Sequence, residues 1–147
     1  MDQVHLHLIS NHIPVIGAFF GAVVLAVGMA RKNPSTLTAA YLVFILSAVT
    51  GLIAFFTGGG AEEAVKDLPG VEKSYIEAHS QMALYTLIAF VLLAVLSLIG
   101  IFRSKKPYEK IRGLAVVIFI VSLIGLGISA YTSMLGGQIR HTEIRSK

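Results

Sequence analysis

The chain has 147 residues, of which 55% are hydrophobic and 14% are charged, and its mean hydropathy is +0.78. An average soluble domain carries about 25% charged residues, so this composition excludes an ordinary water-soluble fold and indicates a membrane protein. The net charge of +4 comes from basic residues at the ends of apolar stretches, which excludes a nucleic-acid-binding stripe of basic and aromatic residues.

Four long stretches contain no Asp, Glu, Lys or Arg: 3–30, 34–61, 78–102 and 113–139. Each is long enough to supply the roughly 20 residues that a helix needs to cross about 30 Å of hydrocarbon. Lipid offers the backbone no hydrogen-bond partners, so spanning segments must be helical. The sequence therefore predicts an all-α integral membrane protein, an antiparallel four-helix bundle. We expect one domain over 1–147, with transmembrane helices at about 12–30, 37–57, 79–102 and 113–136.

Local signals place the ends of the first two helices. Ser10 or Asn11 is expected to cap the first helix, because short polar side chains accept from its free amides. Pro14 suits the first turn, where a missing N–H costs nothing. Asn33-Pro34-Ser35 breaks the chain, and Ser35 or Thr36 is the predicted cap of the second helix.

Glycines suggest where the later helices end. Gly58-Gly59-Gly60 is predicted to end the second helix, followed by a short amphipathic piece over 61–67 and a turn at 68–70. The helical pattern resumes at Val71, so the third helix is expected to project beyond the bilayer. Gly136-Gly137 is predicted to loosen the end of the fourth helix.

Lys and Arg predict the orientation of the bundle. The 31–36 and 103–112 segments carry seven basic residues, and the opposite side carries five that are diluted by acidic side chains. By the positive-inside rule, the first two segments should be cytoplasmic. Both termini and the acidic loop then face the periplasm, with the chain in the inner membrane of a bacterium.

The histidines gather at one end of this predicted topology. His12 begins the first span, His79 begins the third, and His141 follows the fourth, so three helices deliver an imidazole to one level. His5 and His7 are interpreted as tail residues, or as an extension of the same histidine layer. Imidazole is the commonest metal ligand among side chains, and two imidazoles from different helices can hold a haem inside a bundle. We predict haem b with His12 and His79 as the preferred axial pair, and His141 as a further partner.

Small and aromatic residues near these histidines are candidates for the walls of a haem site. On the fourth helix, counting back from His141 predicts a face that includes Gly137, Ala130 and Gly127. Phe90 is expected to wall the ring, and Arg140 to pair with the haem propionates. The absence of cysteine excludes iron–sulfur clusters and covalently attached c-type haem.

Other interpretations of the same residues remain open. A zinc or copper site could use the three histidines, although no paired histidines on one helix support it. The histidines could also form a structural hydrogen-bond network. Gly17, Gly21 and Gly28 form a small-residue face of the kind that mediates helix packing or dimerisation in membranes. The chain would then be a cofactor-free small subunit of a larger respiratory or photosynthetic complex, or a homo-oligomer.

The ordered motifs resemble a group of uncharacterised bacterial four-helix membrane proteins. These carry His-hydrophobic-Pro, a histidine at the head of the third helix, and a closing Gly-Gly…His, which here are His12-Ile13-Pro14, His79, and Gly136-Gly137 with His141. That group is similar to membrane b-type cytochromes, which exchange electrons with quinones. The resemblance implies His12, His79 and His141 as haem ligands. Two-haem cytochromes have ligands toward both membrane faces, whereas this chain has histidines at one end only.

Together these observations favour an electron-transfer protein over a stand-alone enzyme. The predicted partners are the lipid bilayer, a quinone, and a periplasmic redox protein or larger membrane complex. No nucleophilic triad, phosphate-binding loop or dinucleotide fingerprint occurs in the sequence.

Overall fold

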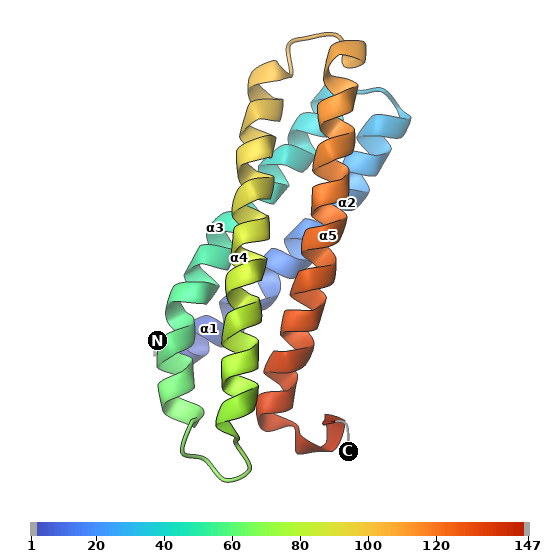
Figure 1. Cartoon of the computed structure of the whole chain (residues 1–147). Coiled ribbons are helices and arrows are strands. Elements are labelled where there is room, and N and C mark those ends of the chain that lie inside the picture. Colours follow the sequence, from blue (N-terminus) through green and yellow to red (C-terminus); the bar gives the residue numbers. More distant parts are fainter. Residues whose placement is uncertain (1–2, 146–147) are drawn as a thin grey trace.

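In a computed structural model, which describes residues 3–145, the chain forms long rods that run antiparallel to one another (Figure 1). The described residues are helical, with short turns between the elements. These elements are α1 (Gln3–Ser10), α2 (His12–Ala30), α3 (Pro34–Val65), α4 (Lys73–Arg103), α5 (Tyr108–Arg140) and the 3-10 turn η1 (Thr142–Ile144).

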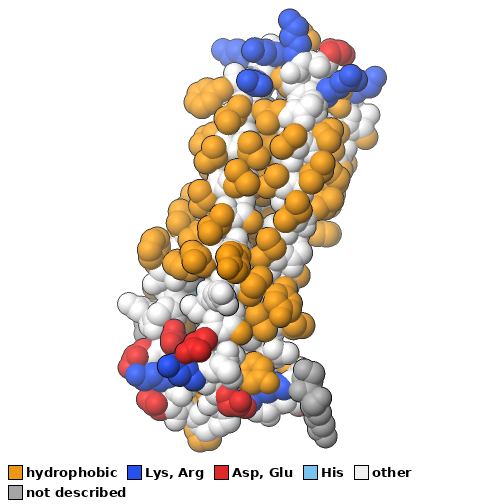
Figure 2. Space-filling view, in the orientation of Figure 1, with side chains coloured by type: hydrophobic (Ala, Val, Ile, Leu, Met, Phe, Trp, Pro, Cys, Tyr) orange, Lys and Arg blue, Asp and Glu red, His pale blue; other side chains and the backbone are white. Residues whose placement is uncertain are grey.

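In the part of the chain that the structure describes, four helical stretches are long and apolar enough to cross a membrane: Gln3–Ala30, Pro34–Val65, Lys73–Arg103 and Tyr108–Arg140. Large apolar side chains cover the outside of the bundle between two charged ends, as Figure 2 shows. Phe102, for example, is 83% exposed. A belt of exposed apolar side chains is unfavourable in water and favourable in lipid. The predicted all-α, four-helix membrane fold is confirmed.

The two ends of the bundle differ in charge. One end, here called the basic end, carries the turns at 31–33 and 104–107, and basic side chains dominate it in Figure 2. The other end, here called the histidine end, carries α1, the 66–72 loop and η1, with acidic and basic side chains mixed. The predicted histidine cluster belongs to this second end.

The predicted end of the second helix at Gly58-Gly59-Gly60 is wrong, because α3 continues through the glycines to Val65. Packing against α1 explains Gly60 instead. A Cβ built on Gly60 would lie 2.6 Å from Cβ of Gln3, so α1 could not approach α3 so closely if a side chain stood there. The turn comes later, at Gly70, whose φ of +79° is a conformation that favours glycine.

The caps also differ from the prediction. Asn33 caps α3, since its side-chain oxygen accepts hydrogen bonds from the amides of Ser35 at 2.9 Å and Thr36 at 3.1 Å. Pro34 then occupies the first helical position, where no amide is needed. Asn11 precedes α2 without a side-chain capping bond, so neither Ser35 nor Asn11 has its predicted role.

Three glycines of α2 allow it to pack closely against α3 of the same chain. A Cβ on Gly17, Gly21 or Gly28 would press on the side chains of Ser47, Phe44 or Leu37 respectively. The interpretation of these three glycines as a packing face is therefore confirmed. Their proposed use as a homo-oligomer surface is wrong, because α3 of the same chain already covers this face. The adjoining core is fully buried around Tyr41, Phe44, Leu93 and Ile118.

Candidate functional site

His7 on α1 and His79 on α4 face each other at the histidine end. Their ring centres are 6.4 Å apart, and the ring planes stand at 89° to one another. Both side chains are half-buried. Two imidazoles that are 72 positions apart in the sequence thus meet near one end of the predicted spans.

Each of these imidazoles is held by a main-chain carbonyl of the neighbouring helix. The Nδ1 atom of His7 lies 2.9 Å from the carbonyl oxygen of Ala54, and Nδ1 of His79 lies 3.0 Å from that of Thr132. A carbonyl can only accept, so Nδ1 of each ring carries the proton and donates. In a neutral imidazole this leaves Nε2 as the atom with the free lone pair.

The two histidine surroundings repeat one arrangement. Four residues after each accepting carbonyl stands a glycine, Gly58 after Ala54 and Gly136 after Thr132. A Cβ built on Gly58 would lie 3.6 Å from Cε1 of His7, and one built on Gly136 would lie 3.0 Å from Cε1 of His79. The carbonyl and the glycine therefore form one seat on the accepting helix. The α2–α3 and α4–α5 hairpins each supply such a seat.

Helix periodicity explains why His7, and not His12, faces the bundle. The backbone stays helical at Asn11 (φ −67°, ψ −26°), so His7 lies two turns before the buried Pro14 on the same face. α1 ends at Ser10, and α2 then buries Pro14 and Ala18 toward the other helices. His12 lies two positions before Pro14, on the opposite side of the helix, and is exposed. Its Nδ1 contacts the side-chain oxygen of Asn11. The structure therefore does not place His12 beside His79.

His141 also lies apart from the pair. α5 ends at Arg140, and His141 leaves the helix with ψ near 86°. Its Nδ1 lies 2.9 Å from Oε1 of Glu143, and both side chains are exposed. Two hydrogen bonds lower the pKa of Glu143: the larger effect comes from its own backbone amide, and the smaller from His141. The carboxylate therefore stays charged beside His141. Within residues 3–145, no group of three or more His, Cys, Asp or Glu side chains could hold a metal ion.

The predicted small face of the fourth helix points away from the bundle. Gly127 and Ala130 are exposed, and Gly137 packs beside Ile144. The buried face of α5 is instead lined by small and polar residues in another register, Ser122, Gly125, Ser129 and Thr132. Counting back from His141 led to the wrong face, because His141 is outside the helix and does not share its inner side.

Phe90 is 1% exposed, but it does not stand open beside the histidine pair. It fills the space between α3 and α5, where Cβ atoms built on Gly51 and Gly125 would lie 3.5 and 3.4 Å from its ring. Arg140 is exposed at the end of α5. The sequence offered His7 only as a tail residue or an extension of the haem layer, not as one of the facing pair. The signal that could have found it is the glycine four residues after each accepting carbonyl, Gly58 and Gly136.

The pair offers two neutral nitrogen donors, the two Nε2 atoms, of the kind that bind a metal ion. A metal that bonds an imidazole on each side at about 2 Å separates the two ring centres by about 6 Å. The observed 6.4 Å agrees with this spacing. Hydrogen bonds from Nδ1 to a carbonyl are the usual way in which metal-binding imidazoles are oriented and made more basic.

The chain belongs to the family described as "Predicted membrane protein (DUF2231)", whose family model matches residues 4–143. No curated protein and no solved structure gives a match to this chain.

Proposed function

We propose that the protein is a membrane b-type cytochrome that binds haem b between His7 and His79. It would transfer electrons between a quinone in the bilayer and a redox partner at the membrane face nearest the haem. The observation that carries this proposal is the facing His7–His79 pair, with a ring separation of 6.4 Å. The axial pair replaces the combination of His12 with His79 that the sequence favoured.

The donor set suits a porphyrin iron better than a zinc ion. A haem already supplies four nitrogen ligands and needs only two axial donors, which is the number that this pair provides. Zinc in proteins usually takes three or four protein ligands. Within the described residues no third His, Cys, Asp or Glu joins the pair.

The surroundings of the pair suit a cofactor that exchanges electrons. Bound haem would supply one-electron chemistry, and the residues of the chain would set its position and its potential. The carbonyls of Ala54 and Thr132 hold the two Nδ1–H groups, so both Nε2 atoms are available without a change of tautomer. Gly58 and Gly136 leave the edges of both rings uncrowded.

The positive-inside rule predicts on which side of the membrane this site lies. The basic end would face the cytoplasm, and the histidine end would then lie at the periplasmic side of a bacterial inner membrane. A haem there would exchange electrons with a partner in the periplasm or with a larger membrane complex.

An optical spectrum of the purified protein tests the proposal. Protein made in haem-sufficient cells should show a Soret band and sharp α and β bands after reduction, with one haem per chain by pyridine haemochrome assay. His7→Ala and His79→Ala should each abolish the six-coordinate spectrum. His12→Ala and His141→Ala are matched controls and should keep it.

Two results would reject the cytochrome. A colourless, iron-free wild type from haem-sufficient cells would favour a cofactor-free membrane subunit. A colourless protein that holds zinc or copper in elemental analysis, and loses it in His7→Ala, would favour a divalent-metal site.

A further inference from the structure

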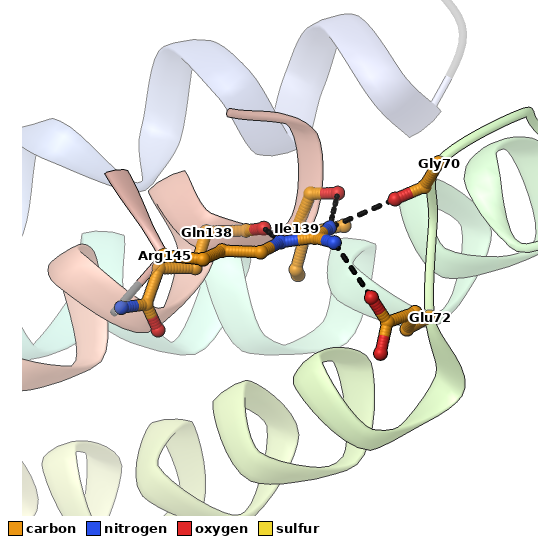
Figure 3. Close-up of polar contacts among 5 residues, drawn as sticks. All are labelled: Gly70, Glu72, Gln138, Ile139 and Arg145. Carbon is orange, nitrogen blue, oxygen red and sulfur yellow. Dashed lines mark hydrogen bonds and ion pairs between the residues drawn. The ribbon is translucent and has the colours of Figure 1, made fainter. Parts of the chain in front are cut away.

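Arg145 ties the segment that follows α5 to the loop that precedes α4 (Figure 3). Its Nη1 donates to Oε1 of Glu72 at 2.8 Å, and its Nη2 donates to the carbonyl oxygen of Gly70 at 2.9 Å. The guanidinium carbon lies 4.3 Å from the ring centre of Tyr75, in the first turn of α4. The Arg145 side chain is only 11% exposed, so these contacts hold it in place.

The same guanidinium binds the last turn of α5. Nε donates to the carbonyl oxygen of Gln138 at 2.8 Å, and Nη2 donates to that of Ile139 at 3.1 Å. Carbonyls in the last turn of a helix lack partners within the helix, and a cation at this end is favoured by the helix dipole. Arg145 therefore holds the end of α5 and the start of α4 with one planar group, an arrangement here called the Arg145 latch.

The Arg145 latch contacts both helices that hold His79, α4 near His79 itself and α5 near Gly136. Tyr75 precedes His79 by one helical turn, so the two side chains lie on the same side of α4. Gly136, which contacts the His79 ring, precedes Gln138 by two residues. The separation of α4 from α5 at this level decides whether the Nδ1–H group of His79 reaches the carbonyl of Thr132.

We infer that Arg145 is a positioning residue for His79. It holds α4 and α5 at the spacing at which His79 donates to Thr132, which fixes the tautomer of His79 and the direction of its Nε2 atom. The inference relies on the proposed function only for the nature of the bound group. His7 is seated on α1 and α3, outside the Arg145 latch, so Arg145 is expected to affect one imidazole of the pair and not the other.

Hydrogen–deuterium exchange on the haem-free protein tests the Arg145 latch. Arg145→Gln should raise the exchange rates of amides in 73–79 and 132–140 about tenfold, because several charge-assisted hydrogen bonds are lost. Exchange in α1 should not change. Arg145→Lys keeps the charge but lacks the planar fork, so it should restore protection only in part. Arg140→Gln, on an exposed arginine at the end of α5, is the matched control and should behave as the wild type.

Nitrogen NMR of the imidazole rings in the same haem-free samples tests the positioning role, with His79→Gln used to assign the signal. The wild type and Arg140→Gln should show His79 protonated at Nδ1, and Arg145→Gln should show a mixture of tautomers. With haemin added, Arg145→Gln should shift the midpoint potential.

Unchanged exchange in Arg145→Gln would overturn the Arg145 latch. Faster exchange with an unchanged His79 tautomer would overturn the positioning role. Failure of the wild type to bind haemin would overturn the proposed function alone, because the exchange and tautomer measurements need no haem.

Discussion

The imidazole planes of His7 and His79 are perpendicular, at 89°, and each ring donates through Nδ1 to a carbonyl of an adjacent helix. Those carbonyl bonds prevent the rings from turning freely about their side-chain torsions. The relative orientation of the planes is therefore a property of the folded bundle, and it can be measured in a haem complex.

The perpendicular planes predict the form of the electron paramagnetic resonance spectrum. Perpendicular axial imidazoles interact with different d orbitals of the iron, which leaves these orbitals close in energy, whereas parallel planes split them. Oxidised protein should therefore give the highly anisotropic low-spin signal with one dominant large g value. An ordinary rhombic low-spin signal from the wild type would contradict the 89° geometry. His12→Ala should leave the spectrum unchanged.

Gly136→Ala should weaken haem retention. The added methyl group would lie 3.0 Å from Cε1 and 3.1 Å from Nδ1 of His79, closer than ordinary packing allows. The ring must then move away from its seat on Thr132. We expect about tenfold weaker haemin binding in a spectroscopic titration, since a displacement of this size costs on the order of 1 kcal/mol.

Gly127→Ala is the control for this change, because a Cβ at Gly127 meets nothing within 4 Å. Equal haemin affinities in the two variants would show that Gly136 is not part of the His79 seat.

Gly21→Ala should destabilise the bundle by about 1–3 kcal/mol, the usual penalty for overpacking a core. The new Cβ would lie 2.6 Å from Cε1 of Phe44, which is fully buried and has little room to move. Reversible unfolding in mixed detergent micelles measures the change. Gly127→Ala serves here too, and should be neutral or slightly stabilising because alanine favours helix. A Gly21→Ala protein as stable as the wild type would argue against close α2–α3 packing.

Ser97→Ala should stabilise the protein by about 1 kcal/mol. The Ser97 hydroxyl is completely buried in α4 and has no hydrogen-bond partner among residues 3–145. An unpaired buried hydroxyl is unfavourable, and its removal leaves only a small change in volume. The same unfolding assay applies, with Ser47→Ala as the contrast, since the Ser47 hydroxyl donates to the Val43 carbonyl at 2.9 Å. Equal effects at the two serines would contradict this assignment.

The all-helical membrane bundle could be predicted because its cause is local in the sequence. Long stretches without charge, such as 34–61 and 113–139, can cross lipid only as helices. The charge-rich segments between them then had to become the ends of the bundle. The interpretation of Gly17, Gly21 and Gly28 as a packing face was also correct, because small residues at helical spacing allow close approach.

The facing pair of histidines could not be predicted in the same way. The rotation of the first span, which buries Pro14 and leaves His12 exposed, and the end of α5 before His141 decided which imidazoles share the inner side of the bundle. A rotation of one helix by two positions is enough to move a side chain from the core to lipid. Gly58-Gly59-Gly60 was interpreted as a helix stop because the approach of α1 to Gly58 and Gly60 depends on the tertiary structure.

The sequence by itself determined that this chain enters a membrane as four apolar helices and that its histidines belong to one end. These properties follow from hydrophobicity and chain order, which do not depend on how the helices rotate. Tertiary structure decided that His7 meets His79, that Phe90 fills the core, and that Arg145 joins α4 to α5. Those contacts depend on helix rotation and crossing, which are set by the packing of side chains that are distant in the sequence.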